Sequence, residues 1–472
     1  MIRTLSRATP PNTARKAAAL ALLCGTAMAA PAQAAATLTT LAAFAAPAPG
    51  HPLNGMVAGT DGAFYGTEFG TISFVYPPPP PVPFPAIFQL THNAKGKPGW
   101  QTTLISAGTP ATLGKPTPSF GNPYLLTPGP GGVLYAAASI NGCLPPVFGV
   151  GWPCAGVVLF TPPPKGQSTW GVSEIARFPN NGLSLQALTR DPSGALIGLG
   201  GGGTIFRLTP PAPGQTAWTP QTLWQLTGGA DGAFPAAPLL IDATGAVYGA
   251  TVSGGAAGCP STKFTTGCGT VFQLAPPAPG QTAQTAQTAR TAQTAQTAQT
   301  AWTETTLYSG TTGPVLLSLR QGGALYGTTQ SGTAGQVVRL DPPKSALPAA
   351  GQPWPLTTLA SFAGGTDGAL PIRLTAGAGG RFYGTTMQGG DASCTPMFPQ
   401  TGAVPGCGVV FGLTPSATGY TKTTIWRFSG GADGASSYGA LVNDGTNLLL
   451  GTTFSGGTGG LGTVYKINIP NH

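Results

Sequence analysis

One short phrase returns seven times along this chain, and a phrase repeated at long intervals predicts a fold built from copies of one unit. In each copy, a strand with an aromatic–Gly–Thr centre leads through a glycine-rich loop to a second strand that ends near proline. The clearest copies occupy residues 246–277, 381–415 and 448–467. The weaker copies centre on Tyr65, Tyr135, Ile197 and Tyr326.

Each repeat can be divided into four short strands, A to D, which predicts an all-β fold. In the fourth repeat these strands are expected at residues 238–242, 246–252, 269–274 and 302–309. Seven such units of four antiparallel strands predict a seven-bladed β-propeller. Residues 36–44 resemble strand D and residues 462–469 resemble strand C. We therefore expect the N-terminal strand to pair with the C-terminal blade, which closes the ring and removes an exposed edge.

The domain organisation follows from composition. Residues 1–34 have a basic start, a short apolar stretch and the small-x-small sequence Ala32-Gln33-Ala34, which predicts a secretory signal peptide cleaved near Ala34. A lipoprotein signal at Cys24 is the less favoured alternative, because Leu23 stands where a small residue is wanted. Residues 35–472 are expected to form a single propeller domain, with a low-complexity Gln-Thr-Ala loop at residues 281–301.

The composition also limits the partners. Only 7% of the residues are charged, and the basic residues are scattered without interleaved aromatic clusters, so no nucleic-acid partner is expected. No later segment is apolar for long enough to predict a transmembrane helix. We expect a monomer that is secreted or periplasmic, with a polysaccharide or a surface protein as its partner.

Six cysteines follow Cys24, and they fall into three local pairs in equivalent loops between strands B and C. Because the repeat register places each cysteine beside its neighbour, we predict local disulfides, which require an oxidising compartment. Metal binding is the alternative, but no histidine accompanies any pair and the spacing is not typical of zinc sites. The predicted pairs are Cys143 with Cys154, Cys259 with Cys268, and Cys394 with Cys407.

Three connections from strand D to the next strand A carry a Gly-Gly-x-Asp-Gly-Ala sequence, centred on Asp231, Asp367 and Asp433. In a four-stranded meander these D–A loops lie at the same end as the B–C loops. That end is the candidate binding surface, because function commonly lies on loops held by a rigid scaffold. The aspartates can cap their turns, or they can orient a polar ligand or bind Ca²⁺, which needs several oxygen ligands for one ion.

Signals for catalysis are weak, and we assign no catalytic or metal-binding residue and no cofactor, with Ca²⁺ as the single candidate ion. The three histidines are His51, His92 and His472, and the three glutamates occupy unrelated repeat positions. The glycine run at residues 200–203 lacks the strand-to-helix context of a phosphate-binding loop. The main hypothesis is a secreted, non-enzymatic binding or scaffold module for a polysaccharide, a peptide or a surface protein.

Two other functions stay open. A propeller lyase or hydrolase acting on a carbohydrate or cyclic peptide would need acid–base or metal groups in one pocket, and this chain has few candidates. A purely structural component of the envelope would need no soluble ligand.

The repeat resembles a known family. Tyr-Gly-Thr-Thr, Gly-Gly, and Gly-Thr-Val-Phe-x-Leu segments in succession are similar to the Gloeo/Verruco (GloVer) tandem repeat of secreted bacterial proteins. The resemblance covers nearly the whole chain after residue 34 and is strongest at residues 248–274, 326–340, 383–413 and 451–467. It implies export and brings no established activity. Many members carry a C-terminal anchor, and none is expected here, because the chain stops soon after the last predicted strand.

Overall fold

The computed structural model describes most of the chain after residue 35. By its contacts the chain divides into two units, Met1–Ala35 and Ala36–His472, and every described residue belongs to the second. The predicted signal peptide and residues 281–301 lie outside the described residues. The described ranges are 36–45, 51–69, 87–93, 99–105, 125–140, 154–165, 167–178, 185–200, 202–255, 267–277, 302–310, 315–329, 334–343, 353–394, 404–445 and 447–469.

Seven sheets of four antiparallel strands make up the second unit. Blade 1 contains β2 (His51–Ala58), β3 (Phe64–Phe69), β4 (Ile87–His92) and β5 (Trp100–Ile105); blade 2 contains β6 (Leu125–Pro128), β7 (Leu134–Ile140), β8 (Cys154–Thr161) and β9 (Gly171–Phe178); blade 3 contains β10 (Leu185–Arg190), β11 (Leu196–Gly200), β12 (Thr204–Thr209) and β13 (Thr219–Gln225). Blade 4 contains β14 (Ala233–Ile241), β15 (Val247–Ser253), β16 (Thr270–Ala275) and β17 (Thr303–Ser309); blade 5 contains β18 (Val315–Gln321), β19 (Ala324–Thr329), β20 (Gln336–Leu340) and β21 (Leu356–Ser361). Blade 6 contains β22 (Ala369–Ala376), β23 (Phe382–Gln388), β24 (Val409–Ser416) and β25 (Gly419–Arg427); blade 7 contains β26 (Val442–Asn443), β27 (Leu448–Thr453), β28 (Thr463–Asn468) and β1 (Thr37–Ala43). The described helices are the short 3₁₀ turns η1 (Pro130–Gly132), η3 (Gly365–Asp367) and η4 (Ala378–Gly380).

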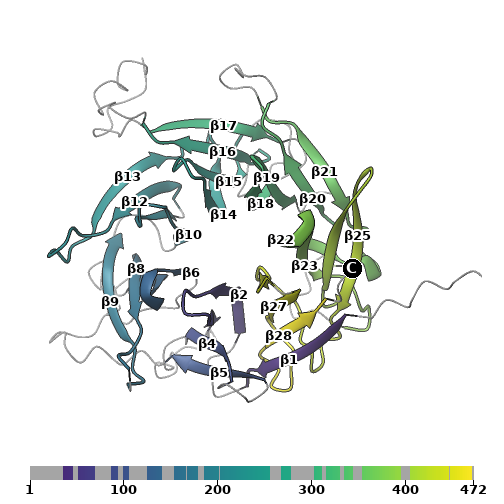
Figure 1. Ribbon diagram of the computed structural model, residues 1–472. Helices are drawn as coiled ribbons and strands as arrows, with labels where there is room; N and C mark the ends of the chain where they lie inside the picture. The colour runs from purple at the N-terminus through teal and green to yellow at the C-terminus, as the bar shows by residue number, and fades with distance from the viewer. Residues whose placement is uncertain are drawn as a thin grey trace, which may run out of the picture. The chain divides into compact units, whose positions relative to one another are not determined.

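The blades surround a common centre, with the first strand of each sheet innermost (Figure 1). The prediction of an all-β, seven-bladed propeller is confirmed. The prediction for the ring closure is confirmed as well, because β1 pairs antiparallel with β28 from Thr37 opposite Asn468 to Ala43 opposite Thr463. The N-terminal strand thus supplies the outer strand of the last blade. None of the helices in the described ranges is long and apolar enough to cross a membrane.

The core lies between neighbouring blades rather than within one of them. Each of seven buried hydrophobic clusters draws side chains from two adjacent blades. At the closing seam, Met56 and Phe88 of blade 1 pack with Leu450 and Val464 of blade 7. A single four-stranded sheet has no core of its own, so its apolar side chains are buried only by packing against the neighbouring blade. The first and last blades can bury theirs in the same way only if the ring closes.

The repeated phrase has a physical explanation in strands B and C, which blade 4 illustrates. Gly249 lies opposite Phe272 in the sheet, and a Cβ atom at this glycine would overlap the phenylalanine ring. Thr251 is fully buried, and its hydroxyl lies 3.0 Å from that of Thr270 and accepts the Thr270 amide at 2.9 Å. Glycine therefore admits the ring, and threonine satisfies buried backbone groups at the end of the strand.

In blades 2 and 3 the tryptophan that opens strand D packs against the tyrosine of strand B in the preceding blade. Trp170 meets Tyr65 edge-on with ring centroids 5.9 Å apart, and Trp218 meets Tyr135 in the same way at 5.7 Å. Trp170 is buried. This arrangement agrees with packing between sheets as the role of these aromatics.

Candidate functional site

The B–C loops and D–A loops lie at one end of the blades, as strand alternation predicts, and we call this end the loop face. In three blades the two kinds of loop are joined by one repeated backbone contact, which we call the loop clasp. The second glycine of the B–C loop donates its amide to a glycine carbonyl of the D–A loop. The bonds are Gly255 to Gly229 at 2.9 Å in blade 4, Gly390 to Gly365 at 2.7 Å in blade 6, and Gly457 to Gly431 at 2.7 Å in blade 7.

Close approach of the backbones makes the clasp specific to glycine. A Cβ atom at Gly389 would lie 2.6 Å from Cα of Gly368 and 2.8 Å from the carbonyl oxygen of Gly365. The φ angle of Gly389 is +75°, a left-handed conformation that glycine adopts without steric penalty. The Gly-Gly pairs of the sequence therefore hold the loop face together.

The structure places Asp231, Asp367 and Asp433 in separate D–A loops and does not bring them together in one pocket. Each carboxylate accepts a hydrogen bond from the backbone amide of the residue four positions earlier. These bonds run from Thr227 to Asp231 at 2.9 Å, from Ala363 to Asp367 at 2.9 Å, and from Ser429 to Asp433 at 3.1 Å. All three aspartates therefore cap their own loops, and their capacity to bind a ligand depends on what else each carboxylate meets.

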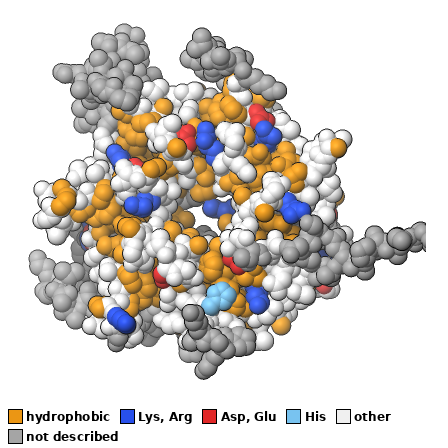
Figure 2. Space-filling view, viewed as in Figure 1, with side chains coloured by type: hydrophobic (Ala, Val, Ile, Leu, Met, Phe, Trp, Pro, Cys, Tyr) orange, Lys and Arg blue, Asp and Glu red, His pale blue; other side chains and the backbone are white. Residues whose placement is uncertain are grey.

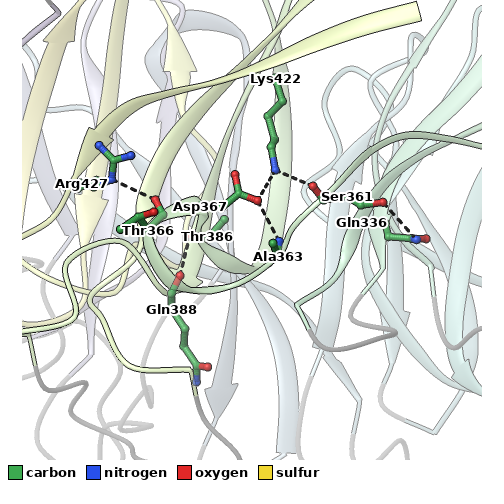
Figure 3. Close-up of polar contacts among 9 residues, drawn as sticks. All are labelled: Gln336, Ser361, Ala363, Thr366, Asp367, Thr386, Gln388, Lys422 and Arg427. Carbon is green, nitrogen blue, oxygen red and sulfur yellow. Dashed lines mark hydrogen bonds and ion pairs between the residues drawn. The ribbon is translucent and has the colours of Figure 1, made fainter.

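The carboxylate of Asp367 forms an ion pair with a lysine on the outer strand of the same blade (Figure 3). Nζ of Lys422 on β25 lies 2.7 Å from Oδ2 of Asp367, donates to the carbonyl of Ser361 at 2.6 Å, and sits 4.0 Å from the ring centroid of Phe362. Arg427 on the same strand donates to the carbonyl of Thr366 at 3.0 Å. The two cations thus tie this D–A loop to β25, and Lys422 is the one that pairs with its carboxylate.

The other two aspartates have different neighbours. Asp433 accepts the indole N–H of Trp426 at 3.1 Å and the hydroxyl of Ser429 at 2.5 Å. Asp231 accepts the hydroxyl of Thr227 at 2.6 Å in addition to its amide, and both bonds lie at the exposed surface. Among the described residues no lysine or arginine forms an ion pair with Asp231.

A disulfide between Cys394 and Cys407 braces the B–C loop of blade 6, with its Cα atoms 5.6 Å apart. It packs against the next D–A loop, since a Cβ atom at Gly430 would strike Sγ of Cys394, and Ser436 donates its amide to the carbonyl of Cys407 at 2.8 Å. Cys268 is also disulfide-bonded. Cys143, Cys259 and the side chain of Cys154 lie outside the described residues, so their pairing stays a prediction.

A feature that the sequence analysis missed is backbone strain directly after the three D–A loops. Phe234, Leu370 and Ser436 follow the three Asp-Gly-Ala sequences and have φ angles of 51°, 57° and 56°. Non-glycine residues seldom adopt this region, and bulky ones are outliers there. The equal spacing from each aspartate is a sequence signal that could have identified the three positions as equivalent.

The opposite end of the blades carries a second polar network that the sequence analysis did not identify. Asp242 in the A–B turn accepts hydrogen bonds from the Thr244 hydroxyl at 2.6 Å and the Tyr248 hydroxyl at 3.0 Å, and Gln273 donates to that tyrosine oxygen at 2.9 Å. Burial alone would raise the pKa of Asp242, but the bonds from Thr244, Tyr248 and the turn amides lower it overall. Burial first, and then Asp242, raise the pKa of Tyr248, so this hydroxyl serves as a donor rather than a base.

The histidines do not form a catalytic pair. Nδ1 of His51 lies 2.7 Å from the carbonyl oxygen of Phe454, and its ring stacks on that phenylalanine with centroids 4.5 Å apart. His92 packs against Trp100 at the other end of blade 1, with tilted rings whose centroids are 3.7 Å apart. In the part of the chain that the structure describes, no three His, Cys, Asp or Glu residues cluster in a way that could hold a metal ion.

Comparison with known proteins assigns the chain to no family. No family model matches it, and no curated protein matches its sequence. Solved structures similar to it include the Dos1 propeller, at 9% identity over 91% of this chain and 95% of that chain with a TM-score of 0.47. YCF48 from Cyanidioschyzon merolae is similar at 10% identity over 91% and 98% of the two chains, with a TM-score of 0.48. The aldose sugar dehydrogenase of Streptomyces coelicolor is similar at 13% identity over 75% and 93%, with a TM-score of 0.34. All three TM-scores lie below 0.5, so the fold assignment rests on the strand pairing described above.

Proposed function

We propose that this propeller is a secreted, non-enzymatic binding or scaffold module whose loop face takes a polysaccharide, a peptide or a surface protein. The loop clasp is the observation that carries the proposal. It fixes the D–A and B–C loops of blades 4, 6 and 7 by backbone hydrogen bonds of 2.7 to 2.9 Å. A surface fixed before binding loses less conformational freedom when a ligand docks, which favours affinity.

Export is part of the same proposal. The sequence of residues 1–34 and the disulfide between Cys394 and Cys407 both suit an oxidising compartment outside the cytoplasm. The resemblance to the GloVer repeat points the same way. N-terminal sequencing of the protein recovered from periplasm and culture medium tests it, with a start near Ala35 as the expected result. An intact N-terminus in the cytoplasmic fraction would overturn it.

A thermal-shift experiment on the purified protein tests the binding function. The panel contains oligosaccharides, peptides and Ca²⁺ with and without chelator. A ligand present at a hundred times its Kd that binds only the folded state adds about 2.7 kcal/mol to the free energy of unfolding. A reproducible rise in Tm supports the proposal. Turnover of a carbohydrate or cyclic peptide would replace it by the enzymatic alternative, and a flat response would favour a structural role in the envelope.

The aspartates separate ligand binding from loop capping. Replacing Asp231, Asp367 and Asp433 together by asparagine removes three carboxylates that each accept a backbone amide. Lost binding with an unchanged Tm would identify a ligand site. A lower Tm with unchanged binding would show that capping is their main role.

A further inference from the structure

Phe234 stands out on the loop face because it is both strained and exposed. Its φ angle is 51°, and its side chain is 54% exposed. Among the described residues the other exposed large hydrophobic side chain is Leu104. Left-handed backbone at a non-glycine residue costs on the order of 1–3 kcal/mol, and such residues concentrate at active sites and ligand clamps.

Leu370 and Ser436 are the equivalent residues in blades 6 and 7, and their side chains pack against the protein instead of facing solvent. Leu370 donates its amide to the carbonyl of Ala334 at 2.8 Å, and Ser436 donates to that of Cys407 at 2.8 Å. Each acceptor stands two residues before strand C of the preceding blade. Leu370 packs against the core between blades 5 and 6, and Ser436 is buried.

Blade 3 presents a different neighbour to Phe234. Its B–C loop is reduced to the three residues between β11, which ends at Gly200, and β12, which begins at Thr204. The carbonyl equivalent to those of Ala334 and Cys407 belongs to Gly202, and it accepts Nε2 of Gln225 at 2.7 Å. The shortened loop explains why the phenylalanine ring stays exposed while its two counterparts are covered.

The D–A loop that carries this ring also differs in its carboxylate. Asp231, three residues earlier, takes both of its hydrogen bonds from Thr227, whereas Asp367 also binds Lys422 and Asp433 also binds an indole. An ionised carboxylate offers about four acceptor sites, so Asp231 has the capacity to accept further donors from solvent or a ligand. Of the three carboxylates, the one with neither a cation nor an indole as partner among the described residues thus shares a loop with the exposed ring.

We propose that Phe234 is the stacking platform of a glycan subsite on the loop face, and this rests on the binding function proposed above. A single exposed flat ring offers an apolar surface to one face of a pyranose, while the carboxylate of Asp231 can accept hydrogen bonds from the sugar hydroxyls. An apolar peptide side chain would need a desolvated pocket to gain comparable affinity. An isolated ring that is 54% exposed provides a platform instead.

Isothermal titration of the full chain with cellohexaose, xylohexaose, laminarihexaose and chitohexaose tests the subsite. We expect at least one of the four to bind, and Phe234→Ala to weaken that binding about tenfold, the size expected for an aromatic contact of this kind. Phe234→Tyr, which keeps the ring, should bind as the wild type does. Leu370→Ala is the matched control at the equivalent position, and it should lower Tm without changing binding.

Phe234→Gly separates a functional ring from a structural one. Glycine relieves the strained φ angle and removes an exposed side chain, so the variant should melt at a higher temperature while it loses glycan binding. If the wild type binds a glycan and Phe234→Ala binds equally well, the subsite is wrong and the binding function stands. If the wild type binds none of the four glycans, the glycan proposal is wrong, and the wider panel with peptides decides the binding function separately.

Discussion

Replacing Gly389 by alanine tests the loop clasp directly. The new Cβ atom would lie 2.6 Å from one backbone carbon and 2.8 Å from a backbone oxygen of the D–A loop, and neither atom can move without moving the loop. Overpacking of this kind costs about 1–3 kcal/mol. The φ angle of +75° adds about 1–2 kcal/mol for alanine. We therefore expect Gly389→Ala to lower the free energy of unfolding by about 2–5 kcal/mol.

Gly379 provides the matched control in the same blade. Its φ angle is +65°, but a Cβ atom there would meet nothing within 4 Å, because it lies in the exposed turn η4 between β22 and β23. Gly379→Ala should therefore show the backbone term alone, about 1–2 kcal/mol. Urea unfolding followed by tryptophan fluorescence measures both variants, with unchanged m-values as the condition for comparing them. Equal losses in the two variants would refute the steric account of the clasp.

Three further predictions concern the carboxylates and the disulfide. Asp433→Ala should lower Tm more than Asp231→Ala, because it removes an indole partner as well as a loop cap worth about 0.5–2 kcal/mol, and differential scanning calorimetry compares the two. The pKa of Asp242 is lowered in the folded state. The ionised carboxylate therefore stabilises the fold above the usual aspartate pKa of about 4, and this stabilisation is lost as the pH falls through the folded pKa. Asp242→Asn should consequently reduce the fall in Tm that the wild type shows at acid pH. Replacing Cys394 and Cys407 together by serine should cost about 2–4 kcal/mol in urea unfolding, and a reducing agent should then have less effect on the variant than on the wild type.

The sequence was sufficient to predict the fold because the information is repeated. The aromatic–Gly–Thr phrase identifies strand B, and the glycine-rich loop and following strand identify the B–C hairpin in copy after copy. The match of residues 36–44 to a fourth strand then predicted the closing pair of β1 and β28. Strand boundaries were less accurate: strand A of blade 4 was expected at residues 238–242 and runs over Ala233–Ile241. Its early residues include Pro235, which a propensity argument does not assign to a strand, and the left-handed backbone of Phe234 is not visible in the sequence.

The details of the candidate site could be predicted only in part. The three aspartates and their common loop face follow from spacing, but the pairing of Asp367 with Lys422 joins residues 55 positions apart and depends on how β25 packs beside the D–A loop. Likewise, the exposure of Phe234 depends on the length of a loop in the preceding blade. Contacts of this kind are set by packing between elements, and a local sequence pattern does not contain them.

The three D–A loops show why departures from the repeat are informative in this protein. The shared residues have structural roles: glycine allows the two loop backbones to approach closely, threonine forms hydrogen bonds with buried backbone groups at the strand ends, and aspartate accepts a backbone amide of its own loop. A residue that serves the same purpose in every blade gives no reason to expect a ligand at one of them. In the loop of Asp367 the carboxylate is paired with Lys422. In the loop of Asp231 the carboxylate has no cation as partner among the described residues, and the loop also carries an exposed aromatic ring beside a shortened loop of the preceding blade. The left-handed backbone is common to Phe234, Leu370 and Ser436, so the exposure of the phenylalanine ring, and not its strain, is the observation that favours a role in binding.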